Sequence, residues 1–367
     1  MITVYRVFQI LMGIIISGFV FYLLVSFAGD YSILGRQGIS QKTLEVFLQD
    51  VDTAYLSGNP IEFEHFNDDY SICYPTPTSP PRISCFMEES SVESERLLLP
   101  ILMRAGDQTL IARSSLDYGW TRLDYILALS DMTVVFNPRD ESDVTWNLIK
   151  EIAGAFPDTT DYKAKVYFNF CDHSQLMITE DIPQRDTFLG ISSRDALDPC
   201  TASLSSNQVL VTISDSCSQS FSESGVCIVP SPTGVGRAYI TGSEDTYVYK
   251  DVADLLALIV GGSSTNILGE PIGGETWRFK NEFMLDELKT SARVMGERCR
   301  QLLGMYSSEN PCKASYDGLM NSLMRVGSLA DSDYGDPAAM GNLLTWLGNS
   351  RDRWQELLDK GCERYGS

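Results

Sequence analysis

Histidine is nearly absent from the 367-residue chain, which contains only His65 and His173. This excludes zinc sites with three histidine ligands, and the HExxH helix of metalloproteases does not occur. The sequence also lacks a GxSxG elbow, an SxxK pair and a Walker A phosphate loop, which mark serine hydrolases, β-lactamases and P-loop NTPases. The sequence therefore predicts no catalytic, cofactor-binding or metal-binding residue.

Basic residues are scarce: 28 Lys and Arg stand against 49 Asp and Glu, giving a net charge of −21. Binding to a phosphate backbone requires Lys and Arg to displace counterions, so we exclude nucleic acid as a partner. The body should also be repelled by anionic lipid headgroups. Solubility or adaptation to salt is the simplest reason for the acidity, and a patch for cations or a basic partner is the alternative.

Charge is missing altogether from Val7 to Ala28, a run of 22 residues in which Gln9 is the one strongly polar side chain. At 1.5 Å per residue, such a helix crosses a hydrocarbon core of about 30 Å. A buried helix of a soluble domain would show a polar face. The sequence therefore predicts an uncleaved transmembrane anchor over residues 1–29. A signal peptide cleaved after Ala28 is the alternative.

None of the nine cysteines lies in a CxxC pair, which disfavours zinc ribbons and thioredoxin-like centres. Cys73 and Cys85 flank the proline-rich tract of CYPTPTSPPRISC, between two short β-prone runs. Cys217 and Cys227 flank a polar loop in the same way. We predict a disulfide across each loop, worth about 3 kcal/mol of stability where the geometry is unstrained.

The other five cysteines give one further candidate pair and one group of three. Cys171 and Cys200 are a third candidate pair. Cys299, Cys312 and Cys362 lie near the ends of three predicted helices, and an up-down-up arrangement would bring them to one end of that bundle. Two of these three could bond, and the odd total leaves at least one thiol unpaired or intermolecular.

Disulfides persist in oxidising compartments, so the body is predicted to be extracytoplasmic behind a single-pass anchor in the cell membrane. The alternative is a cytoplasm-facing membrane protein with buried, reduced cysteines. The positive-inside rule does not decide between them, because Arg6 precedes the apolar run while Arg36 and Lys42 follow it.

The predicted fold class is α+β, with five segments along the chain. A juxtamembrane amphipathic helix at 30–58 follows the anchor, from which Gly35 and Gly38 separate it. The others are a mixed α/β domain at 59–262, a Gly-rich connector at 263–274 and a three-helix subdomain at 275–367.

Within the α/β domain, periodicity predicts short strands and three helices. The strands are 96–104, 108–116, 132–138, 162–170, 207–214, 226–230, 238–242 and 245–250, and the helices are 118–130, 140–156 and 251–262. A strand, a helix and a strand across 132–170 predict one βαβ unit with a right-handed crossover.

Three polar clusters have a simpler interpretation than a ligand-binding or catalytic site. Asp172 and His173 follow a predicted strand, and we interpret them as an ordinary loop pair. Asp331–Asp336 departs from a calcium loop in the positions of its glycine and glutamate, so helix capping explains it better. Asp251 is interpreted as the N-cap of a helix.

The order of apolar helix, amphipathic helix and strand-bearing head resembles the layout of pilin-like subunits. The chain has neither the Gly cleavage site before the apolar run nor an early acidic residue within it, so the resemblance concerns layout alone. The sequence predicts a non-catalytic surface, adhesion or assembly component that binds the bilayer through Val7–Ala28 and either a protein partner or its own copies. The alternative is an extracytoplasmic hydrolase that uses carboxylates in an α/β cleft.

Overall fold

The computed structural model describes residues 4–64, 70–73, 82–83, 92–93, 98–99, 102–103, 106, 108–139, 142–159, 161–171, 208–220, 223, 225–262 and 271–362. For most of residues 4–40, and for the strands between residues 70 and 103, this description covers the backbone and not the side chains. We call residues 4–40 the stalk and residues 41–362 the head.

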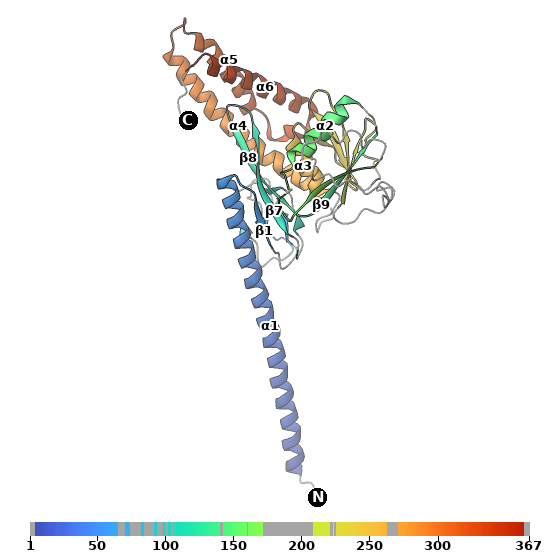
Figure 1. Cartoon of the computed structure of the whole chain (residues 1–367). Coiled ribbons are helices and arrows are strands. Elements are labelled where there is room, and N and C mark those ends of the chain that lie inside the picture. The colour runs from blue at the N-terminus through green and yellow to red at the C-terminus, as the bar shows by residue number, and fades with distance from the viewer. Residues whose placement is uncertain are drawn as a thin grey trace.

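The chain begins with one helix, α1 (Val4–Ser57), which is 54 residues long. Its rise of 1.5 Å per residue gives a length of about 81 Å. Figure 1 shows α1 standing away from the head, with the N-terminus at its far end. The helix continues through Gly35 and Gly38, so the predicted interruption there is wrong. A glycine costs a helix only about 1 kcal/mol relative to alanine, which its neighbours in a long helix can offset.

The predicted anchor at Val7–Ala28 lies within α1, but many of its side chains are outside the description. Among the described residues, no helix has both the length and the hydropathy of a membrane span.

The last turns of α1 pack on a four-stranded sheet with the order β1-β7-β8-β5. Its strands are β1 (Ile61–Phe63), β7 (Thr109–Asp117), β8 (Arg122–Leu129) and β5 (Leu98–Leu99). The α1 residues in this contact share one face at three- and four-residue spacing, which confirms the predicted amphipathic stripe: Leu44, Phe47, Val51 and Ala54.

Strand β8 corrects the helix predicted at 118–130. It pairs with β7 in an antiparallel hairpin, whose turn places Gly119 at a φ of +80°. Both faces of β8 are buried, since Tyr125 and Leu127 face the main core while Ile126 faces α1. A strand buried on both faces loses the alternation of apolar and polar residues, so periodicity cannot distinguish it from a buried helix.

A second small sheet has the order β4-β3-β2-β6. Its strands are β4 (Val92–Glu93), β3 (Arg82–Ile83), β2 (Tyr70–Cys73) and β6 (Leu102–Met103). The single strand predicted at 96–104 is therefore wrong, because β5 and β6 belong to different sheets and flank Pro100. Proline has no amide hydrogen to donate to a ladder, which explains the division.

The largest sheet has the order β10-β9-β11-β12-β13-β14. The strands from β10 to β12 run parallel, and β13 and β14 add two antiparallel neighbours. They are β9 (Met132–Pro138), β10 (Val166–Phe170), β11 (Gln208–Ile213), β12 (Val226–Val229), β13 (Gly236–Ile240) and β14 (Tyr247–Tyr249). Helix α2 (Asp143–Ala155) connects β9 to its parallel neighbour β10, which confirms the βαβ unit.

Helix α3 (Val252–Gly261) follows β14, and it confirms the helix predicted at 251–262. The Asp251 side chain accepts a 2.8 Å hydrogen bond from the Asp254 amide, so the predicted N-cap is also confirmed. Helices α2 and α3 lie side by side and bury their apolar faces in the main core.

The C-terminal helices are α4 (Ile272–Met305), α5 (Pro311–Gly327) and α6 (Pro337–Asp359), with a 3₁₀ turn η2 (Asp331–Gly335) before α6. Helix α4 takes in the last residues of the predicted connector, whose residues 263–270 lie outside the description. One continuous hydrophobic core joins these helices to β8, α2, α3 and the six-stranded sheet. Figure 1 shows α4, α5 and α6 at the end of the head farthest from the N-terminus. The described elements make an α+β fold.

Candidate functional site

The carboxyl ends of β9, β11 and β12 meet at one edge of the six-stranded sheet. Open α/β sheets bind ligands at this edge, next to the point where the strand order reverses. Here the order reverses at β9, because β10 lies on one side of it and β11 on the other. Two pockets lie along this edge.

The larger pocket has a volume of about 320 Å³ and lies between α2, the β12–β13 loop and the junction of β14 with α3. Two carboxylates line it: Glu151 from α2 and Asp251 from the N-terminus of α3. Ser231 and Tyr249 add hydroxyl-bearing side chains to its wall. Its volume falls at the lower end of the range for small-molecule sites.

The Glu151 side chain forms no hydrogen bond or ion pair with any residue that the structure describes. Partial burial raises the pKa of its carboxyl group, and the negative charge of Asp251 raises this pKa further. The pKa of Asp251 moves the other way: burial alone would raise it, but the charges of Lys250 and Lys280 outweigh burial and lower it. The two carboxylates of the pocket therefore differ in their tendency to hold a proton.

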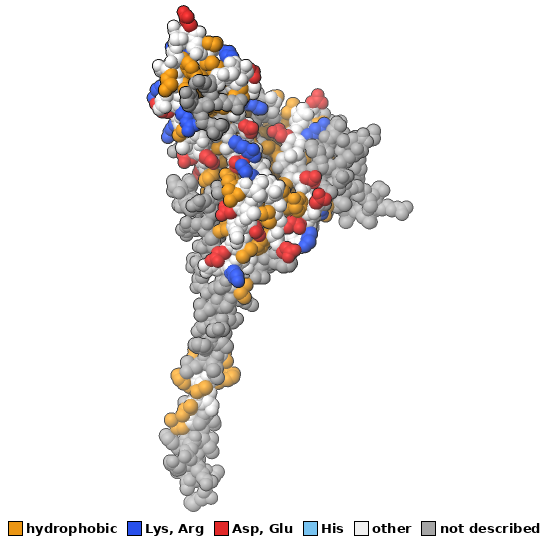
Figure 2. Space-filling view, turned by 60° about the vertical axis from the view of Figure 1, so that its left-hand side comes forward, with side chains coloured by type: hydrophobic (Ala, Val, Ile, Leu, Met, Phe, Trp, Pro, Cys, Tyr) orange, Lys and Arg blue, Asp and Glu red, His pale blue; other side chains and the backbone are white. Residues whose placement is uncertain are grey.

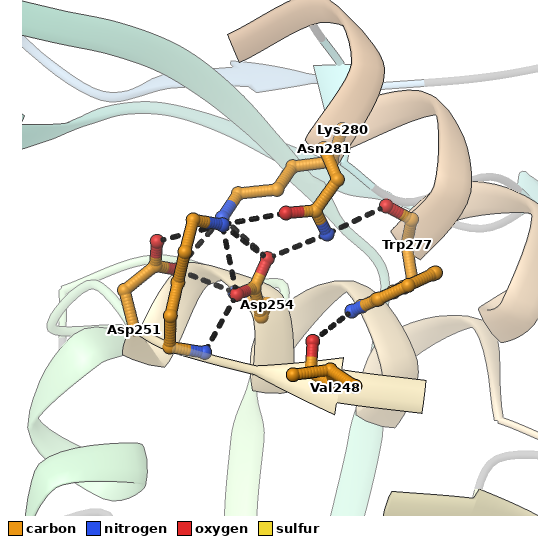
Figure 3. Close-up of polar contacts among 7 residues, drawn as sticks. Val248, Asp251, Asp254, Trp277, Lys280 and Asn281 are labelled. Atoms are coloured by element: carbon orange, nitrogen blue, oxygen red, sulfur yellow. Dashed lines mark hydrogen bonds and ion pairs between the residues drawn. The ribbon is translucent and has the colours of Figure 1, made fainter. Parts of the chain in front are cut away.

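Behind Asp251 lies a buried charge network, which we define as Lys250, Asp251, Asp254, Lys280 and Asn281 (Figure 3). Lys280 Nζ donates to Asp251 Oδ1 and to Asp254 Oδ1, each at 2.7 Å. Lys250 Nζ lies 3.0 Å from Asp254 Oδ2. The side chains of Lys280 and Asp254 are both 0 % exposed.

Two lysines and two aspartates make the charge network neutral overall. Burial would lower the pKa of Lys280, but the charges of Asp251 and Asp254 outweigh burial and raise it. A buried ion needs such partners because its desolvation costs several kcal/mol. Since Lys280 and Asn281 belong to α4, the network joins this helix to α3 and the end of β14.

The smaller pocket, of about 180 Å³, lies at the ends of β9 and β11. Arg139 forms an ion pair with Glu223 across it, and Thr212 Oγ1 donates to Glu223 Oε2 at 3.2 Å. The pocket also borders the disulfide between Cys217 and Cys227. The Glu223 carboxylate therefore has an ion-pair and a hydrogen-bond partner within the chain, whereas the Glu151 carboxylate has neither among the described residues.

Two disulfides are formed between described cysteines: Cys217–Cys227 and Cys312–Cys362. The second joins the start of α5 to a cysteine three residues beyond the end of α6 at Asp359. Cys299 remains a free, buried thiol on α4, and burial raises its pKa to about 11.

Cys171 is also disulfide-bonded, to a cysteine outside the described side chains. Its predicted partner Cys200 lies outside the described residues, as does Cys85. The backbone of Cys73 ends β2, which pairs with β3 as an antiparallel hairpin. The predicted Cys73–Cys85 and Cys171–Cys200 bonds therefore stay predictions.

The other polar clusters have the following outcomes. Asp172 and His173 lie outside the described residues. Asp336 caps α6, since its side chain accepts a 2.9 Å hydrogen bond from the Ala338 amide. Asp333 accepts one from the Ala330 amide at 3.0 Å. Among the described residues, no group of histidine, cysteine or acidic side chains could hold a metal ion.

Sequence reasoning singled out Asp251 only as a cap, and it missed Glu151, Lys280 and Asn281. A signal was present, because Lys280 and Asn281 interrupt a helical stripe that also contains Trp277 and Met284, all of them buried. A charged residue on a predicted core face needs a buried partner of opposite charge.

Comparisons with protein-family models, curated proteins and solved structures find no match for this chain. The interpretation of its function therefore depends on its own residues and geometry.

Proposed function

We propose that this protein is a non-catalytic, single-pass membrane protein whose extracytoplasmic head acts as a surface or assembly component. The observation that carries this proposal is the continuity of α1 from the stalk into the core of the head. A helix that is fixed at one end can hold a head at a set distance and orientation from whatever binds the other end.

The attachment of α1 to the head has a polar clamp as well as an apolar contact. Arg113 on β7 donates a 2.8 Å hydrogen bond to the carbonyl oxygen of Tyr55, and its guanidinium lies 4.9 Å from the centre of the Tyr55 ring. Asp124 on β8 forms an ion pair with the same guanidinium, and its Oδ2 lies 2.6 Å from Arg113 Nη2. Arginine suits this role because one rigid group can stack and donate several hydrogen bonds together.

The stalk supports a membrane or self-association role. Its described side chains include large apolar groups that are 41–69 % exposed: Met12, Ile16, Phe19, Val20, Phe21, Tyr22 and Val25. Figure 2 shows these orange side chains on the stalk, whereas red and blue side chains are interspersed over the head. With the uncharged run from Val7 to Ala28, they favour burial in a bilayer. The disulfides favour an oxidising compartment for the head.

One preparation tests both parts of the proposal. Membranes from cells making the full chain are washed at alkaline pH and then treated with an alkylating reagent under denaturing conditions, without reductant. We expect the chain to stay in the membrane fraction, with Cys299 alkylated and Cys217, Cys227, Cys312 and Cys362 protected until reductant is added. Release by the wash contradicts the anchor. Alkylation of all nine cysteines without reductant contradicts the oxidising compartment.

The second candidate function is an extracytoplasmic hydrolase, and the larger pocket favours it. Glu151 and Asp251 line this one pocket, and their surroundings shift their pKa values in opposite directions. Paired carboxylates of this kind serve as acid and base in glycoside hydrolysis. In this candidate Glu151 holds the catalytic proton and Asp251 stays ionised.

Replacing Glu151 by glutamine tests this candidate, because the amide keeps the shape of the side chain but cannot exchange a proton. With a panel of fluorogenic glycosides as substrates, the E151Q variant should lose a factor of about 10²–10⁴ in turnover. E244Q, at an acidic residue that lines neither pocket, is the control. Equal turnover by E151Q and the parent chain, or no turnover of any glycoside, contradicts the candidate.

A further inference from the structure

Within the charge network, the shortest contact of either lysine joins two groups that can react with each other. Lys250 Nζ lies 2.5 Å from Oδ1 of the Asn281 side chain. A C=O bond is about 1.23 Å long, so the carboxamide carbon of Asn281 lies no farther than about 3.7 Å from this nitrogen. Reacting atoms in a near-attack arrangement lie about 3–3.5 Å apart. The Lys250 amine is thus held next to an electrophilic carbon.

Asp254 bridges the two groups in the position that proton transfer requires. Its Oδ2 lies 3.0 Å from Lys250 Nζ, and its Oδ1 accepts a 2.8 Å hydrogen bond from Asn281 Nδ2. One carboxylate therefore contacts both the nitrogen that would attack and the nitrogen that would leave. A positioned acid or base within this distance is the geometric requirement for general acid–base catalysis.

Burial favours this chemistry over hydrolysis. The exposed fractions are 8 % for the Lys250 side chain, 0 % for that of Asp254 and 1 % for Asn281. The Trp277 ring, whose Nε1 donates to the carbonyl oxygen of Val248 at 3.0 Å, lies beside them (Figure 3). Burial of Asn281 keeps water, the competing nucleophile, away from its carboxamide carbon.

Lys280 has a different environment from Lys250, and this explains which lysine reacts. Its Nζ contacts two carboxylate oxygens, those of Asp251 and Asp254, and carboxylates are poor electrophiles. Lys280 therefore remains a cation that balances Asp251. When Lys250 loses its proton to Asp254, the charge network keeps one positive and one negative charge.

We propose that Lys250 and Asn281 form an intramolecular isopeptide bond. Lys250 transfers one proton to Asp254, and the neutral amine attacks the carboxamide carbon of Asn281. A second amine proton then moves to the amide nitrogen through Asp254. The C–N bond of the carboxamide breaks, and ammonia leaves. The products are the new amide, one ammonia molecule and Asp254 in its protonated form, so atoms and charges balance without an oxidant or a cofactor.

The bond would tie the six-stranded sheet to the C-terminal helices covalently. Lys250 directly follows β14, while Asn281 lies in the third turn of α4. The closed loop contains α3 and residues 263–270. This inference does not depend on the proposed membrane anchor or on the hydrolase candidate.

Intact mass spectrometry of the full chain, reduced and denatured, is the primary test. We expect a mass lower than that of the fully reduced sequence by one ammonia molecule. Tryptic digestion should give a branched peptide that joins the segments around Lys250 and Asn281, because trypsin does not cleave at an acylated lysine. The full sequence mass overturns the proposal. A loss of water in place of ammonia also overturns it, since that result indicates a bond from a lysine to an aspartate.

Variants of Lys250 and Asn281 test whether the bond joins these two residues. K250R keeps the positive charge but has a guanidinium that cannot become a neutral nucleophile, so this chain should have its full mass. N281A should also have its full mass. R278K, at an exposed residue of α4 outside the charge network, is the matched control and should retain the ammonia loss. If these variants fail to fold, the mass of the unaltered chain and its branched peptide still decide the question.

Discussion

Replacing Lys280 by methionine should lower the free energy of unfolding of the head by about 3–5 kcal/mol. Methionine fills a similar volume, so the loss comes from the charge and not from a cavity. Asp251 and Asp254 would each lose a 2.7 Å contact with a cation whose side chain is fully buried. Domains are stable by only about 5–15 kcal/mol, so this change removes a large share of that stability. Guanidinium unfolding in mild detergent, followed by tryptophan fluorescence, measures it, since all five tryptophans lie in the head.

Arg278 supplies the matched control, because it precedes Lys280 by two residues on α4. Its ion pair with Asp245 spans 3.5 Å, and the two side chains are 48 % and 62 % exposed. Exposed pairs contribute about 0–1 kcal/mol, so R278M should change stability by no more than that. Adding D251N to K280M should recover part of the loss by restoring neutrality. Equal effects of K280M and R278M would show that the network is not the stabilising element described here.

Replacing Phe47 by alanine should also lower the free energy of unfolding of the head by about 3–5 kcal/mol. This side chain is fully buried where α1 enters the head. Its ring packs edge-on against that of Phe63, with centroids 5.3 Å apart. The cavity left by the ring would lie between α1 and the β7–β8 sheet. The expected result is a weakened attachment of α1, measured as a lower unfolding midpoint together with faster proteolysis near Ser57, where the helix ends.

The neighbouring residue separates a packing effect from a helix effect. Val46 belongs to the same turn of α1 but is 44 % exposed, so V46A should change stability by no more than about 0.5 kcal/mol. Both replacements raise helix propensity, so unchanged or slower proteolysis in both variants would indicate that α1 is held by helix propensity alone and not by its contact with the sheet.

The regular parts of the fold could be predicted from the sequence because their patterns are local. Helix α6 begins at Pro337, directly after the capping residue Asp336, and this signal needs no knowledge of distant contacts. The amphipathic stripe around Phe47 was equally clear. Strand β8 was not predictable in this way, since burial of both its faces depends on α1 and on the main core, which pack there from distant parts of the chain.

The charge network shows the same limit at the candidate site. Asp251 and Asn281 are 30 positions apart, and no spacing rule relates a residue before α3 to one in α4. Asp251 had a local interpretation, as a helix cap, and Asn281 had none. Their contact through Asp254 arises only when α4 packs against α3. Lysine on a core face was the one local sign that a buried partner had to exist.

The unbroken α1 has a consequence for any partner of the head. Successive residues of an α-helix are separated by a rotation of about 100° and a rise of 1.5 Å. Adding one residue between positions 29 and 40 would therefore swing the head by about 100° around the axis while hardly changing its height. Seven added residues would nearly restore the azimuth and lift the head by about 10 Å. The number of residues between the apolar run and the head therefore sets the angular position of the head around the helix axis.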